Sequence, residues 1–132
     1  MSFKLTDPPI EDRSRELWLQ HAAGFIIFED IRNYAIDRIP TDSDEKTRAA
    51  IINGIDDAVY GLMMIMDGVT GTLQNSEYTV RIESKILLEK KGGILQEINT
   101  LEGDGMCMGF HSWKEGDFGE DDIYMQSHRK SY

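Results

Sequence analysis

Cys107 and His111 are the two side chains whose types and spacing come nearest to catalytic chemistry. A thiol beside an imidazole can act as a nucleophile, because the imidazole lowers the thiol pKa. In an extended chain, however, residues four apart lie about 13 Å from each other, too far for a direct hydrogen bond. A lone cysteine between two methionines, Met106 and Met108, is more typical of a packed core. We therefore expect Cys107 to pack, and we predict no catalytic residue.

His21 and Asp56 are the other titratable side chains on predicted apolar helix faces. A histidine on such a face is more often hydrogen-bonded in the core than catalytic, and Asp56 is interpreted as a residue at the rim of its helix face. The alternative hypothesis is a small enzyme or ligand-binding domain with a pocket between helices and sheet. That pocket would use His21, His111, Asp56 or Cys107, so these groups would have to converge in the fold.

The sequence predicts neither a metal nor a cofactor. A zinc site needs three or four cysteine or histidine ligands at recognisable spacing, whereas the one cysteine and three histidines are scattered along the chain. The carboxylates of residues 117–122 are oxygen ligands of the kind that Ca²⁺ takes, but the run lacks the alternating ligands and distal glutamate of an EF-hand loop. A solvated acidic loop is the favoured interpretation, with adventitious calcium binding left as an alternative.

Negative charge is concentrated in residues 102–122. This segment carries seven carboxylates against the single Lys114, and so accounts for six of the ten net negative charges of the chain. Nucleic acids and anionic lipid surfaces would be repelled, because their binding depends on lysine and arginine. A basic protein partner is expected instead, with Trp113 as an aromatic anchor. The predicted partner-binding residues are Asp104, His111, Trp113, Glu115, Asp117, Glu120, Asp121 and Asp122.

The composition favours a protein-binding module in the cytoplasm. A single cysteine cannot form an internal disulfide, and an unpaired thiol is unusual in secreted proteins. Residues 1–13 lack the apolar run of a signal peptide, and the apolar runs at 17–28 and 51–66 are interrupted by polar residues, so no membrane span is expected. An inhibitor or immunity protein that neutralises a basic toxin or nuclease fits this pattern and needs no catalytic residue.

Two helices are predicted in the first half of the chain. Apolar residues at helical spacing indicate a helix over residues 11–39 that Pro40 ends. A second helix is expected from Asp42 to about Asp67, with Gly68 as the left-handed residue after its end. Small residues on the second helix, Ala50, Gly54, Ala58 and Gly61, predict a close approach of another helix. We expect an antiparallel helical hairpin, whose excess apolar surface also allows a homodimer through the helices.

The second half is predicted to form a β-meander. The period changes to two from Tyr78, which indicates a strand over residues 78–89, a turn at 91–93 and a return strand over 94–101 with Ile98 opposite Ile86. A third antiparallel strand is expected to begin near Gly105. The predicted fold class is α+β, with the helical hairpin packed on one face of a three-stranded antiparallel meander. Residues 1–132 form one domain, with an irregular arm at 1–10 and a frayed tail at 123–132.

Overall fold

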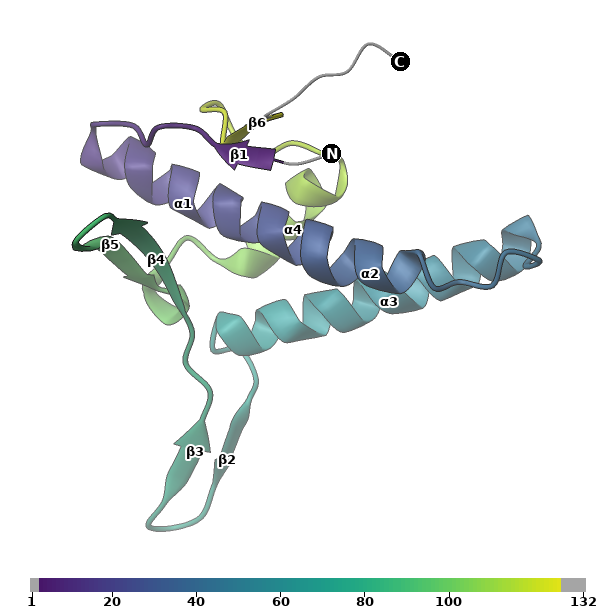
Figure 1. Ribbon diagram of the computed structural model, residues 1–132. Helices are drawn as coiled ribbons and strands as arrows, with labels where there is room; N and C mark the ends of the chain where they lie inside the picture. Colours follow the sequence, from purple (N-terminus) through teal and green to yellow (C-terminus); the bar gives the residue numbers. More distant parts are fainter. Residues whose placement is uncertain (1–2, 127–132) are drawn as a thin grey trace.

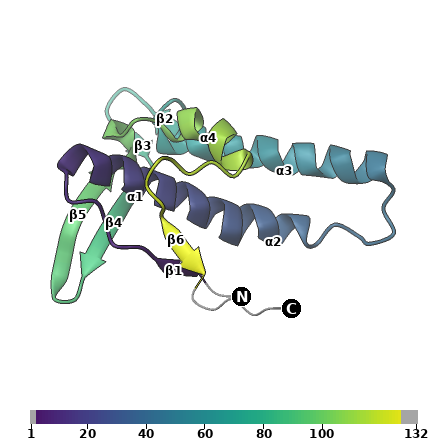
Figure 2. The ribbon, with the colours of Figure 1, turned by 90° about the horizontal axis from the view of Figure 1, so that it is seen from above.

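The computed structural model describes residues 3–126 and has a mixed α+β architecture. Figures 1 and 2 show two long helices lying antiparallel, a short helix across them, and several two-stranded antiparallel pairs around this helical body. The α+β class is therefore confirmed. The strands form three separate pairs instead of one meander: β1 with β6, β2 with β3, and β4 with β5.

The first helical segment runs without a break through α1 (Asp12–Ile26), a π-helical stretch (Ile27–Arg32) and α2 (Asn33–Ile36). The Glu11 carboxylate accepts the backbone N–H groups of Arg13 and Ser14, and so caps the start of α1. The helix ends shortly before Pro40, as the sequence predicts. This segment supplies residues to both apolar clusters of the core.

The second helix, α3 (Glu45–Met66), returns antiparallel to the first. Its N-cap is Asp44, two residues later than the predicted start at Asp42. The Asp44 carboxylate accepts the N–H of Thr47 at 2.7 Å. Gly68 follows the helix with φ of 80°, as predicted. The close helix contact predicted along the small residues is wrong, because a Cβ added at Gly54 or Gly61 would meet no atom within 4 Å.

Among the helices of the described residues, only α3 is long enough and apolar enough to cross a membrane, judged by length and composition alone. The core helices of soluble proteins share this length and composition. The helix also carries Asp56 and Asp57 near its middle, and an aspartate at the centre of a membrane span costs about 3 kcal/mol.

The predicted strand over residues 78–89 is divided in two. β3 (Thr79–Arg81) pairs with β2 (Thr72–Gln74), and the two form a hairpin that projects from the body. β4 (Lys85–Lys90) pairs with β5 (Gly93–Asn99), and Ile86 lies opposite Ile98 as predicted. A bulge at Leu88 and Glu89 interrupts the register of this second hairpin.

The predicted third strand is wrong, because Met106–Lys114 form the helix α4. The Asp67 carboxylate accepts the backbone N–H groups of Met106 at 2.6 Å and Cys107 at 2.9 Å, and so caps this helix from another part of the chain. Met106, Phe110 and Trp113 are buried at spacings of four and three, which is the period of a helix. The predicted three-stranded meander is therefore not formed.

The chain ends described by the structure are ordered. β1 (Phe3–Leu5) pairs antiparallel with β6 (Tyr124–Gln126), and Ile123 before β6 is buried. An irregular arm was thus the wrong prediction for residues 3–5, and a frayed tail was wrong for residues 123–126. The predicted fraying of residues 127–132 lies outside the described residues.

The core consists of two neighbouring apolar clusters. α1 and its π-helical extension contribute to both clusters, and Phe118 packs against both. The first cluster contains Ile27, Phe28, Val59, Met63, Met106, Phe110 and Trp113. The second contains Trp18, Leu19, Leu88, Ile98 and Ile123.

Candidate functional site

Residues 115–122 form an irregular segment between α4 and β6, which we call the acidic loop. Its backbone is held against α1 and the N-terminal strand, since the indole N–H of Trp18 donates to the carbonyl of Asp122 at 3.0 Å and the hydroxyl of Thr6 donates to the same carbonyl. Phe118 inserts its ring edge-on against Phe25, with ring centres 5.4 Å apart. The loop backbone thus has a fixed position although it has no regular secondary structure.

Two glycines give the acidic loop its path. Gly116 and Gly119 have φ of 84° and 95°, in the region that side chains disfavour. The Asp117 carboxylate accepts the N–H of Gly119 at 3.1 Å, which closes a local turn. A Cβ at Gly119 would lie 2.6 Å from Cδ2 of His21, so the loop passes directly over this imidazole.

The carboxylate side chains of the acidic loop are exposed to solvent. All five of its carboxylate residues are exposed, and none forms an ion pair with a residue in the part of the chain that the structure describes. They are Glu115, Asp117, Glu120, Asp121 and Asp122. The loop therefore presents concentrated negative charge on a fixed backbone.

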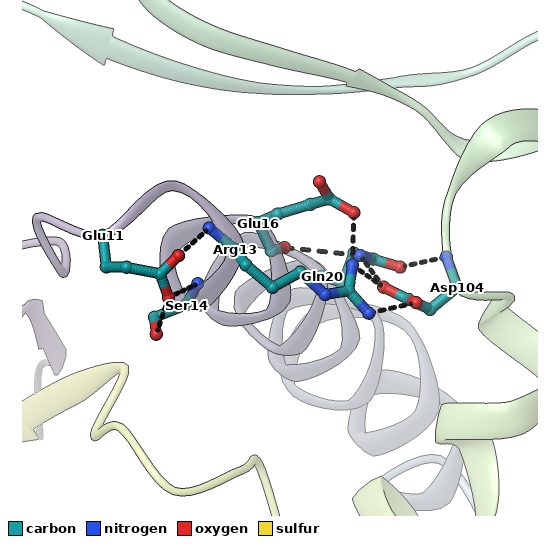
Figure 3. A network of polar contacts seen from close by, with 6 residues as sticks. All are labelled: Glu11, Arg13, Ser14, Glu16, Gln20 and Asp104. Atoms are coloured by element: carbon teal, nitrogen blue, oxygen red, sulfur yellow. Dashed lines mark hydrogen bonds and ion pairs between the residues drawn. The ribbon is translucent and has the colours of Figure 1, made fainter.

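Asp104 lies apart from this set and its charge is paired. Figure 3 shows the Arg13 guanidinium binding the Asp104 carboxylate through two nitrogens, at 2.7 and 3.1 Å. Gln20 donates to the same carboxylate at 2.6 Å and accepts the Asp104 N–H at 2.8 Å. The hydrogen bond from Arg13 holds the pKa of Asp104 below its ordinary value despite partial burial. Asp104 fastens the start of α4 to α1 and contributes little free negative charge.

Trp113 is buried, with only 3% of its surface exposed. Its indole N–H donates to Nδ1 of His21 at 2.8 Å, and its ring lies against Gly24 of α1 and Gly109 of α4. Trp113 therefore joins two helices and lacks the exposed aromatic surface that an interface anchor needs.

No hydrogen bond joins His111 to Cys107 within residues 3–126, although the two lie about one helical turn apart on α4. His111 is exposed, and its ring lies beside those of Tyr60 and Phe110, with ring centres 6.0 and 5.6 Å away. Burial, followed by the neighbouring Asp67 carboxylate, raises the pKa of the Cys107 thiol. A nucleophilic cysteine needs the opposite shift, so this thiol is unsuited to attack.

Asp56 has a structural partner set of its own. Its buried carboxylate forms ion pairs with Arg32 and, at 3.4 Å, with Lys114. Burial opposes its ionisation, but the two cations outweigh burial and keep the pKa of Asp56 below its ordinary value. Asp56 thus connects α3, the first helical segment and α4, and no hydrogen bond links it to His21, His111 or Cys107 within residues 3–126.

Three hollows adjoin the acidic loop. A polar hollow of about 340 Å³ is formed by the loop itself with Ile123 and Tyr124. An apolar hollow of about 160 Å³ shares Ile123 and Tyr124 and is otherwise lined by Phe3, Lys4, Leu5, Ala22, Phe25 and Ile26. A third hollow, of about 310 Å³, lies between α1 and the loop and is lined by Ser14, Leu17, Trp18, His21, Gly119, Glu120 and Asp121.

Neither known protein families, nor curated proteins, nor solved structures give a match to this chain. Its function is therefore inferred from the fold and from the chemistry of its surface. Within residues 3–126, no three histidine, cysteine, aspartate or glutamate side chains converge in a way that would hold a metal ion.

The apolar residues beside the acidic loop could not be found from the sequence. Phe3 and Tyr124 lie at opposite ends of the chain and meet only because β1 pairs with β6, where their rings pack edge to face at 4.9 Å. Phe25 stacks on Tyr124 at 4.4 Å. Strands of three residues carry too little periodicity to predict this pairing.

Proposed function

We propose that this protein binds a basic protein partner through the acidic loop and the apolar hollow beside it. An inhibitor or immunity protein in the cytoplasm, which neutralises a basic toxin or nuclease, is the class of function that this surface fits best. The main observation behind the proposal is that Asp117, Asp121 and Asp122 line a polar hollow, and that this hollow shares Ile123 and Tyr124 with the apolar hollow next to it.

The two parts of this surface have different physical roles. The carboxylates would accelerate the encounter with a basic partner and disfavour acidic ones. The hollow lined by Phe25 and Tyr124 would receive an apolar side chain, which supplies the desolvated contact that most of the binding energy comes from. Because the loop backbone is already held by Trp18 and Phe118, little conformational entropy would be lost on binding.

The binding residues differ in two respects from those that the sequence suggests. Trp113 is replaced as the aromatic contact by Phe25 and Tyr124, since it is buried between helices. Asp104 is left out because Arg13 neutralises it. His111 is exposed on α4 and stays in the proposed contact surface with the five loop carboxylates.

The proposal is tested with two variants of equal charge. The loop variant carries D117N, E120Q, D121N and D122N, and the matched control carries D30N, D37N, D42N and D57N, four exposed acidic residues of the helical hairpin. The full chain and both variants serve as baits for proteins of the source cell at low and at physiological salt. The captured basic partner is then purified and its dissociation constants with the three proteins are measured.

We expect the loop variant to lose about 100-fold in affinity or more, because several charges of one surface act together on the partner. The matched control is expected to change by less than about 3-fold, and added salt should weaken the wild-type complex. Equal losses in both variants would mean that only bulk charge matters. Retention of the partner by the loop variant would refute the proposal.

A second candidate function is a small-molecule site in the hollow between α1 and the acidic loop. It is favoured by His21, which is half-buried there and whose Nδ1 already accepts the Trp113 indole N–H, so that Nε2 carries the proton and can donate to a ligand. Asp56 takes no part because it is paired with Arg32 and Lys114, and Cys107 takes no part because it packs against the first core cluster. A fragment screen read by thermal shift, with His21→Gln as the comparison, tests this candidate: hits that also stabilise the variant equally would contradict it.

A further inference from the structure

The hairpin of β2 and β3 leaves an apolar face uncovered. Every residue from Gly68 to Glu83 is exposed, and Figure 1 shows the hairpin projecting away from the helical body. Leu73 pairs with Val80 and so shares a face with it, and the two-residue period of an extended chain puts Tyr78 and Ile82 on that face too. The opposite face carries the polar residues Thr72, Gln74, Thr79 and Arg81.

The projecting hairpin is built to hold its shape. In its turn, the Asn75 side chain accepts the N–H groups of Glu77 at 2.9 Å and Tyr78 at 2.8 Å. At its root, the buried Thr100 hydroxyl bonds to Ser84 at 2.6 Å and donates to the carbonyl of Met66 at 2.9 Å, which ties both ends of the hairpin to the body. A two-stranded hairpin by itself is only marginally stable in water, so this one needs a surface against its apolar face.

We propose that the apolar face of this hairpin packs against the same face of a second copy of the chain, in a symmetric dimer. The size of the face agrees with this. Each large aliphatic side chain contributes about 100 Å² of buried surface and an aromatic one about 150 Å², so the four give about 450 Å² per copy and about 900 Å² for the pair, which is the size of a weak, transient interface. The four are Leu73, Tyr78, Val80 and Ile82, which are 60% to 78% exposed.

Charge favours a second copy over the other occupants. Only Glu77, Arg81 and Glu83 are charged among residues 68–83, and Arg81 and Glu83 lie 3.7 Å apart as an ion pair. In a chain of net charge −10, two copies meet with the least repulsion at such a nearly neutral surface. A basic partner would gain little electrostatic attraction at this surface, and an anionic lipid surface would be attracted by Arg81 alone. A twofold axis lets each face cover the other, which is the commonest arrangement of homodimers.

The test compares two neighbouring positions on β3. Val80→Lys places a charge on the apolar face, whereas Thr79→Lys places the same charge on the polar face. Both residues are exposed and distant from the core, so both variants should keep the far-ultraviolet circular dichroism and the urea midpoint of the wild type. The mass of each full-length protein is measured by sedimentation equilibrium over a range of concentrations.

We expect the wild type to reach twice the chain mass of 15.1 kDa and Thr79→Lys to behave like it. Val80→Lys should raise the dissociation constant of the dimer by about 100-fold or more, because the lysine would be buried without a partner. Specific interfaces have dissociation constants in the micromolar range or below. A wild type that stays monomeric up to a concentration of about 100 μM would therefore overturn the proposal. Equal behaviour of the two lysine variants, or flotation of a monomeric wild type with phosphatidylcholine vesicles, would also overturn it.

This proposal is independent of the acidic loop. Val80→Lys leaves all five loop carboxylates in place, so it should still bind the basic partner while failing to dimerise. The loop variant should show the reverse, which makes the failure of one proposal distinguishable from the failure of the other.

Discussion

Replacing Gly24 by alanine is expected to destabilise the protein, although the same change inside most helices is stabilising. Gly24 lies within α1, and the indole of Trp113 packs directly on it. A Cβ at this position would come within 2.6 Å of Cε3 of Trp113 and closer still to two other ring atoms. Atoms at such separations overlap, so either the ring or the helix must move.

The indole is restrained by further contacts. An added Cβ at Gly109 would lie 2.7 Å from Cε2 of the same ring, and the indole N–H donates to His21. Alanine gains about 1 kcal/mol over glycine in helix propensity, while overpacking a core costs about 1–3 kcal/mol. Because the ring contacts both Gly24 and Gly109 and its N–H is bonded to His21, we expect the upper end of that cost, and hence a net loss of about 2 kcal/mol, or roughly 6–10 °C in Tm.

Urea unfolding followed by far-ultraviolet circular dichroism measures this loss. Gly54→Ala and Gly61→Ala are the matched controls, since an added Cβ meets no atom within 4 Å at either position, and each should gain about 1 kcal/mol. Introducing Gly24→Ala into a Trp113→Leu background should cost less than half as much as in the wild type, because the ring is gone. A Gly24→Ala protein as stable as the wild type, or an unchanged cost in that background, would refute the packing argument.

The remaining predictions concern buried polar contacts. Asp56→Asn should cost about 3 kcal/mol or more at pH 7, since it leaves Arg32 without its carboxylate, and the difference from wild type in urea unfolding should shrink as the pH falls through the lowered pKa of Asp56. Asp67→Ala should cost about 1–2 kcal/mol by removing the cap of α4, measured in the same way. Burial keeps the pKa of His21 below its ordinary value of 6.5, so on acidification the unfolded chain binds the proton before the folded protein does. The free energy of unfolding should therefore be highest above pH 6.5 and fall as the pH decreases below it. A His21→Gln variant should lose this part of the pH dependence, and it also loses the hydrogen bond between His21 and Trp113.

The long helices and the β4–β5 hairpin could be predicted because their signals are local. The apolar period of the first helix and Pro40 after it are visible in the sequence, and the turn at Gly92 and Gly93 brings Ile86 opposite Ile98. The β1–β6 pair could not be predicted for two reasons. Its two strands are more than one hundred residues apart in the sequence, and each has only three residues, too few to show a period.

The exposure of the carboxylates of the acidic loop could also be predicted, since a run of carboxylates cannot be buried without partners. The contacts that hold its backbone could not. Trp18 and Thr6 meet the carbonyl of Asp122 from the other end of the chain, and nothing in the local composition signals this. A segment with the composition of a mobile loop is therefore held in place by distant residues.

One error of period accounts for most of the change in the proposed site. Met106, Met108 and Phe110 alternate like a strand, but Met106, Phe110 and Trp113 also follow a helical period, and the Asp67 cap favours the helix. In a strand, Trp113 would share a face with Cys107 and His111; in α4 it shares the buried face with Met106 and Phe110.

This change of face decides which aromatics a partner can reach. Trp113 packs against Gly24 and Gly109 in the core and is not available to a partner. The aromatic residues beside the acidic loop are instead Phe25 and Tyr124, which stack on each other and line the apolar hollow. The indole that the sequence offers as an anchor instead fixes α4 to α1 and orients His21 beneath the loop. Removing Trp113 should therefore weaken partner binding only as far as it loosens the loop. Making the wall of the apolar hollow polar at the exposed Ile26, as in Ile26→Gln, should instead weaken binding directly in a protein that stays folded.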